Sequence, residues 1–107
     1  RRMIYSLGVT YDTTVDQMKA IPAMVEAIIN EIPNTNFNRC HFTEFGDSSL
    51  NFELVYYIDT RDYTIALNAQ QAINLGIMKS FANEGIEFAF PSQTLYLEGD
   101  SVAGKAS

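Results

Sequence analysis

The fold of this chain is constrained most by the order of two hydrophobic patterns in its sequence, one typical of strands and one typical of helices. Residues 3–11, "MIYSLGVTY", alternate apolar and polar positions, which is typical of a strand covered on one face. From residue 14 the apolar positions recur every three or four residues instead, which indicates an amphipathic helix. The chain therefore changes from strand to helix within its first fifteen residues or so, and both patterns return later.

The first helix should begin at a capping box, "TVDQ" (14–17), in which Thr14 and Gln17 each satisfy an unpaired backbone N–H. Its apolar stripe comprises Met18, Ile21, Val25, Ile28 and Ile32. Pro22 interrupts the stripe, and a proline inside a helix costs about 3 kcal/mol. We therefore expect a break near Ile21, with Pro22 opening the longer helical segment.

A β-hairpin and a second helix follow the turn residues "PNTN" (33–36). Residues 37–45 and 50–58 read as strands around the turn "GDSS" (46–49). One face of the second strand is apolar throughout, at Leu50, Phe52, Leu54, Tyr56 and Ile58. Helical periodicity returns over residues 62–83, and Gly85 suits the left-handed residue that closes a helix. The small residues Ala69, Ala72 and Gly76 predict a close approach of this helix to the sheet.

The end of the chain supplies the last strand. Residues 86–90, "IEFAF", predict it, and Pro91 ends its pairing because proline lacks a backbone N–H. The element order predicts an α+β fold, a ferredoxin-like βαββαβ sandwich with a C-terminal strand extension, in which two helices cover a four-stranded antiparallel sheet. We assign residues 1–91 to this domain, 92–98 to the strand extension and 99–107 to a flexible tail.

Charge and cysteine content narrow the function. The net charge is −6 and the seven basic residues are scattered, so we expect no nucleic-acid partner. The single Cys40 excludes an intrachain disulfide and favours a reducing compartment. No run approaches the ~18 apolar residues that span a bilayer. The chain starts at Arg1 rather than at methionine, and we expect it to be an excised part of a longer protein.

His41 and Glu53 form the one candidate pair of reactive side chains. Alternation along the strand puts His41 on the uncovered face of the sheet, and hairpin registers set Glu53 opposite either His41 or Thr43. Such a pair could serve as a base or as half of a metal site. Without a second ligand or further histidine in the sequence, we interpret it as a surface cross-strand pair.

The remaining reactive residues predict no catalytic centre. Cys40 points to the opposite face from His41, so the imidazole cannot activate the thiol, and Cys40 is expected in the core. Ser48 and Ser49 lie in a turn without a base, and the glycines are too dispersed for a phosphate-binding loop. We expect no catalytic residue, no cofactor and no metal, and hence no enzyme.

The second helix carries two groups of residues away from its core stripe. Its amides could bind a polar ligand, although solvated amides are the commoner reading; they are Asn68, Gln70, Gln71 and Asn74. Leu67, Leu75 and Met78 are apolar positions off the core face, which favours packing against another domain or subunit.

Four stretches, in this order and spacing, carry a resemblance to a known family: "LGVTYDTT", "EFGDSSLNFELVYY", "QQAINLGIMKSFANEGI" and "FAFPSQTLYL". From about residue 3 to residue 97 the chain resembles the C-terminal cytoplasmic domain of the small-conductance mechanosensitive channel family, MscS. The resemblance implies a homo-heptameric channel of the cell membrane that opens under bilayer tension and releases ions and small solutes during hypo-osmotic shock. The membrane contact would come from transmembrane helices absent from this chain.

The resemblance also implies a place for this domain and a role for its end. The domain would lie on the cytoplasmic side as part of a hollow vestibule, and the chain would then give one strand to a small β-barrel shared between subunits. That inter-subunit strand comprises Gln93, Thr94, Leu95, Tyr96 and Leu97. The net negative charge of the domain would raise the concentration of cations near the vestibule. The alternative is a small-ligand-binding regulatory domain of ferredoxin-like fold, using the open sheet face or the helix amides.

Overall fold

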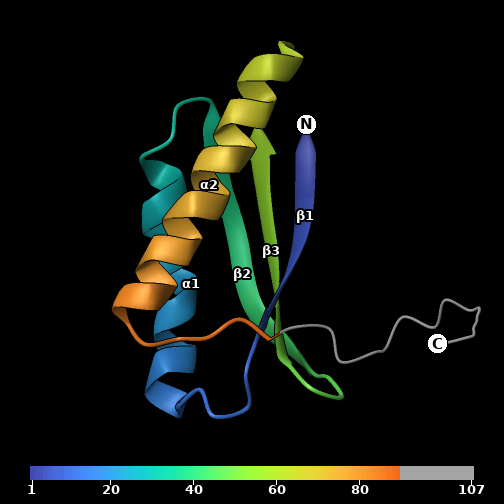
Figure 1. Cartoon of the computed structure of the whole chain (residues 1–107). Coiled ribbons are helices and arrows are strands. Elements are labelled where there is room, and N and C mark those ends of the chain that lie inside the picture. The colour runs from blue at the N-terminus through green and yellow to red at the C-terminus, as the bar shows by residue number, and fades with distance from the viewer. Residues whose placement is uncertain (90–107) are drawn as a thin grey trace, which may run out of the picture.

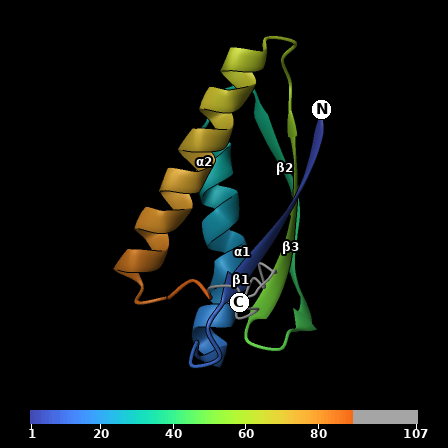
Figure 2. The ribbon, with the colours of Figure 1, turned by 45° about the vertical axis from the view of Figure 1, so that its right-hand side comes forward.

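The computed structural model describes residues 1–89. They form β1 (Arg2–Val9), α1 (Val15–Asn30), β2 (Thr35–Phe45), β3 (Leu50–Ile58) and α2 (Tyr63–Asn83). The three strands make one antiparallel sheet in the order β1-β3-β2. Both helices cover the same face of this sheet (Figure 1 and Figure 2). The predicted α+β class is therefore confirmed.

The core lies between the sheet and the helices, and β3 supplies its centre. All five alternate side chains predicted for the buried face of β3 are buried; they are Leu50, Phe52, Leu54, Tyr56 and Ile58. A fully buried side chain of this size stabilises the fold by about 1.5–3 kcal/mol. The pattern of β3 thus fixes which face of the sheet the helices cover.

Helix α1 begins as predicted but does not break at Pro22. The Thr14 hydroxyl accepts a hydrogen bond from the backbone N–H of Gln17, and the Gln17 side chain accepts one from the N–H of Thr14. Pro22 lies inside one continuous helix, so the expected break near Ile21 is wrong. Ile21 and Val25, on either side of the proline, are fully buried, and their burial outweighs the ~3 kcal/mol cost of the proline.

At Gly76, helix α2 makes a close approach to α1. A Cβ added to Gly76 would lie 2.7 Å from Cγ2 of Ile28, which is too close for any side chain. The predicted close approach is confirmed at Gly76, but there the neighbour is α1 and not the sheet, and Ala72 is exposed. At the end of α2, Gly85 has the predicted left-handed conformation, with φ of +70°.

The predicted fourth strand is reduced to a single bridge in the described residues. Val9 and Phe88 form that antiparallel bridge, flanked by a 3.1 Å bond from Thr10 N to Glu87 O and a 3.0 Å bond from Ala89 N to Gly8 O. Within residues 1–89, the sheet therefore has three strands where four were expected. A continued register would set position 91 opposite Ser6, and proline has no N–H to donate to the carbonyl of Ser6.

The predicted domain boundaries fall at the end of the chain. The boundary at residue 91, the extension over 92–98 and the tail over 99–107 all lie outside the described residues. They stay predictions.

Candidate interaction surfaces

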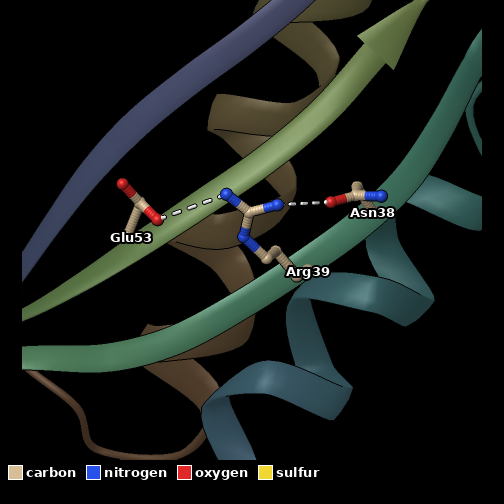
Figure 3. Close-up of polar contacts among 3 residues, drawn as sticks. All are labelled: Asn38, Arg39 and Glu53. Atoms are coloured by element: carbon tan, nitrogen blue, oxygen red, sulfur yellow. Dashed lines mark hydrogen bonds and ion pairs between the residues drawn. The ribbon is translucent and has the colours of Figure 1, made fainter.

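The open face of the sheet carries the predicted His41–Glu53 pair and an ion pair that the sequence did not indicate. The register sets His41 opposite Glu53. The carboxylate of Glu53, however, lies 3.8 Å from Nη2 of Arg39, whose Nη1 donates a 3.0 Å hydrogen bond to Asn38 (Figure 3). Both charged side chains are more than two fifths exposed, so the ion pair contributes at most about 1 kcal/mol.

The ion pair between Arg39 and Glu53 is diagonal across β2 and β3. The register shifts between Phe37 and Arg39, which sets Arg39 opposite Val55, two positions along β3 from Glu53. Val55 is fully buried although it lies on the open face, between Ile4 of β1 and Arg39 of β2. Among the described residues, no hydrogen bond or ion pair joins His41 to Glu53. The two residues of the predicted surface pair therefore lie opposite each other in the strand register without a direct polar contact. The role of the pair stays a prediction.

On the helix side of the sheet, two tyrosines and two amides form a hydrogen-bonded network. Tyr5 donates a 2.8 Å hydrogen bond to Oδ1 of Asn74. Gln70 accepts from the hydroxyl of Tyr56 and donates to the hydroxyl of Tyr5, and its Nε2 also lies 3.0 Å from Oδ1 of Asn74. The two tyrosine rings meet edge to face, with centroids 6.1 Å apart. The network therefore joins β1 and β3 to α2.

The pKa of Tyr56, one member of this network, is raised mainly by burial. Burial raises the pKa of Tyr56 to about 12, the neighbouring Tyr5 acts in the same direction, and the hydrogen bond to Gln70 acts against them. The hydroxyl of Tyr56 is thus a neutral donor at any physiological pH.

Two of the four helix amides are therefore occupied within the fold. Asn68 and Gln71 are exposed, as expected for solvated amides, whereas Gln70 is half-buried against the tyrosines. The sequence held a signal for this: Tyr5 and Tyr56 occupy core-facing positions, and a buried hydroxyl needs a partner. Gln70 and Asn74, one helical turn apart, offer one.

Cys40 lies in the core, as predicted. Its side chain is 6% exposed, and burial raises the pKa of the thiol to about 11. Because the thiolate is the reactive form, this thiol is unreactive near neutral pH. Within residues 1–89, no three His, Cys, Asp or Glu side chains gather closely enough to hold a metal ion.

Helix α2 also presents apolar side chains to the outside. Leu67, Leu75 and Met78 are each about half exposed or more, which agrees with their positions off the core stripe. The expectation that they pack against another domain or subunit stays a prediction. Neither helix in residues 1–89 has the length and apolar character needed to span a membrane.

The chain leaves the described part of the fold at the outer edge of β1. Beyond Gly8, toward its N-terminus, β1 has no strand beside that edge among the described residues. The predicted inter-subunit strand, Gln93 to Leu97, lies outside them. The structure gives the position of Ala89, four residues before that segment.

Comparison with known proteins gives a consistent result over nearly the whole domain. The family model described as "Mechanosensitive ion channel MscS, C-terminal" matches residues 3–88. The small-conductance mechanosensitive channel MscMJ of Methanocaldococcus jannaschii is 40% identical over 102 residues, which is 94% of this chain and 29% of that protein.

Two further relatives show the same coverage. The large-conductance mechanosensitive channel MscMJLR of Methanocaldococcus jannaschii is 39% identical over 100 residues, 89% of this chain and 28% of the relative. The low conductance mechanosensitive channel YnaI of Escherichia coli is 32% identical over 100 residues, 92% of this chain and 29% of the relative. The chain therefore spans less than a third of the length of each of these channels.

Proposed function

Because this chain belongs to the mechanosensitive ion channel MscS family, as its C-terminal domain, we propose that it is a non-catalytic assembly domain of a mechanosensitive channel. The observation that carries the proposal is the match of the family model to residues 3–88, which takes in both helices and all three strands except Arg2. The names of three relatives support the same activity for the parent protein.

The parent protein, in this proposal, is a homo-heptameric channel of the cell membrane. It opens under bilayer tension and lets ions and small solutes leave during hypo-osmotic shock. This domain lies on the cytoplasmic side, in the wall of a vestibule, and the membrane-spanning helices belong to other parts of the protein. The outward apolar residues Leu67, Leu75 and Met78 support contact with a neighbouring subunit or domain.

Reconstitution of the full-length protein tests this proposal. Patches of protein-containing liposomes should show currents that appear with applied suction, and mass measurement in detergent should give seven copies. A full-length protein that inserts into liposomes yet gives no tension-dependent current would overturn the channel proposal. A stable assembly of another size would overturn only the heptamer.

The segment Gln93 to Leu97 is proposed to pair with its equivalents in neighbouring subunits. The single bridge at Phe88 supports this proposal, because it leaves the chain at the edge of β1 just before a proline. A full-length protein ending at residue 91 should then keep a folded domain and lose assembly, while one ending at residue 98 should assemble normally. Unfolding of the domain in the shorter protein would show that residues 92–98 belong to its core.

The acidic balance of the domain is proposed to enrich cations around the vestibule, within the Debye length of about 8 Å. Glu53 and Glu87 carry exposed or half-exposed carboxylates suited to a test. Glu53→Lys or Glu87→Lys in the full-length channel should shift the reversal potential in a salt gradient toward the anion value. An unchanged reversal potential in both variants would contradict a role for these charges.

The alternative, a small-ligand-binding regulatory domain, loses part of its support. Gln70 and Asn74 would have formed half of the amide surface, and both are bonded to tyrosines of the sheet.

A further inference from the structure

An apolar groove lies between the start of α1 and the turn end of the β2–β3 hairpin. Its volume is about 440 Å³. The wall from the loop before α1 and from α1 itself comprises Thr13, Val15, Met18, Lys19 and Pro22. The wall from the sheet comprises Cys40, His41, Phe42, Phe45, Leu50 and Phe52. Neither the proposed channel function nor the family match assigns a role to this groove.

Three phenylalanines, Phe42, Phe45 and Phe52, line the sheet side of the groove. Two of them share a side of β2 because the alternation of its side chains between the two faces is interrupted near the end of the strand. The register shifts between Phe42 and Glu44, so Phe42 and Phe45, three positions apart, come to the same side of the strand. Their ring centroids lie 5.0 Å apart, and that of Phe52 lies 5.6 Å from Phe42. Phe45 is 74% exposed and Val15 is 69% exposed. Apolar side chains are therefore left in solvent on both walls of one groove.

The groove carries a single fixed charge, and its sign is opposite to that of the protein. Among the described residues, Lys19 is the only Lys, Arg, Asp or Glu that lines the groove, whereas the whole chain has a net charge of −6. Within residues 1–89, Lys19 makes no ion pair within 4 Å; the one cation paired nearby is Arg39, which is held by Glu53. An apolar groove next to an unpaired ammonium group complements a molecule with an apolar body and a negative end.

We propose that this groove binds a single-chain amphipathic carboxylate, that is, a fatty acid anion. Its hydrocarbon chain would lie between Val15 and Met18 on one side and the phenylalanines on the other, and its carboxylate would lie at Lys19. The groove volume falls in the range of about 300–1,000 Å³ that is usual for small-molecule sites, and such sites are mostly apolar with few polar groups. The inference goes beyond the proposed channel function and does not depend on it.

The two parts of the ligand contribute unequally. The side chain of Lys19 is exposed, so its ion pair with a carboxylate accounts for about a two- to fivefold gain in affinity. Burial of the hydrocarbon chain supplies most of the affinity. Removing Phe45 should therefore weaken binding more than removing the charge of Lys19.

The test uses dodecanoate, below its micelle concentration, with the present chain. Backbone NMR shifts on titration should change first at Val15, Met18 and Phe42, and calorimetry gives the dissociation constant. Lys19→Gln should weaken binding about two- to fivefold, and Phe45→Ala more than about tenfold, with unchanged circular dichroism. Lys79→Gln, which removes a charge from α2, is the matched control and should bind as the unaltered chain does.

A second ligand separates the charge from the apolar body. Dodecyltrimethylammonium has the same chain and the opposite charge, so it should bind at least fivefold more weakly than dodecanoate. Equal binding of the two amphiphiles, or shifts confined to residues outside the groove, would overturn the proposal. So would a dimer in light scattering that Phe45→Ala dissociates, because the groove would then hold a second copy of this chain.

Discussion

The hydroxyl of Tyr5 in β1 donates a 2.8 Å hydrogen bond to Oδ1 of Asn74 in α2, although 69 positions separate the two residues in the chain. Gln70 extends this contact to Tyr56 in β3. Because the hydroxyl of Tyr56 lies in the core, it has few other partners, and the amide of Gln70 fixes where α2 sits over the sheet.

Replacing Gln70 by alanine should therefore destabilise the domain more than its exposure suggests. Gln70→Ala leaves the buried hydroxyl of Tyr56 without its acceptor, which costs about 1–3 kcal/mol of unfolding free energy. Urea unfolding followed by circular dichroism measures it. Gln71→Ala, the same change at the exposed next position, should stay within about 0.5 kcal/mol. Equal losses in the two variants would contradict the role of the network.

Stability should fall at alkaline pH in two steps. The pKa of Cys40 is raised from 9.0 to about 11 and that of Tyr56 from 10.0 to about 12, so the unfolded chain loses these protons first. The stabilisation is complete below pH 9 and is lost as the pH rises through 9–11 for Cys40 and 10–12 for Tyr56. Urea midpoints between pH 8 and 12 measure this loss, with Cys40→Ala and Tyr56→Phe as comparisons. Each variant should have a shallower pH slope in its own window, and slopes equal to that of the unaltered chain would contradict the assignment.

Gly76→Ala should destabilise the domain despite the better helix propensity of alanine. The new methyl group would stand 2.7 Å from Cγ2 of Ile28, and overpacking costs about 1–3 kcal/mol against a gain of about 1 kcal/mol in propensity. In an Ile28→Ala background the clash is absent, so the same change should become neutral or stabilising. Thermal and urea unfolding of all four proteins gives the coupling. Independent, additive effects would show that the helices do not meet at this point.

Pro22→Ala should make the domain more stable. The change restores an N–H inside α1 and removes most of the ~3 kcal/mol that an interior proline costs a helix. Against this, the unfolded chain regains conformational entropy, which lowers the free energy of unfolding by about 1 kcal/mol. The expected gain is about 2 kcal/mol in unfolding free energy. Pro33→Ala, in the turn before β2, has only the second effect and should lower stability slightly. A loss of stability in Pro22→Ala would show that the proline ring is needed for packing.

Periodicity and local chemistry predicted most of the fold. The alternation of β3, the capping box at Thr14 and the left-handed Gly85 each depend on residues within one turn or strand, so the sequence reveals them directly. Pro22 was misjudged because the burial of Ile21 and Val25, a tertiary effect, decides whether the helix continues.

The surfaces were harder to predict than the core. Glu53 pairs with Arg39, a diagonal neighbour, although His41 lies directly opposite it, and a bulge turns Phe45 toward Phe42; neither is visible in a strict alternation. The spacing of three between Phe42 and Phe45 was the available signal for this bulge. The sequence offered the members of the network, two core-facing tyrosines and two amides one helical turn apart. Which amide meets which tyrosine depends on how α2 packs on the sheet, which local patterns do not contain.

The short pairing of Phe88 with Val9 has a mechanical consequence. A force applied to the chain beyond Ala89 reaches two backbone hydrogen bonds, Ala89 to Gly8 and Thr10 to Glu87, before it reaches any helix or strand. A pull away from the sheet would break the bond of Ala89 first, then separate the stacked rings of Phe81 and Phe88, 5.0 Å apart, and then break the bond of Glu87. The next resistance is the buried Ile86, whose N–H donates a 2.8 Å hydrogen bond to the carbonyl of Phe81. Load on this end of the domain would thus detach a few residues and leave the three-stranded sheet and its helices intact.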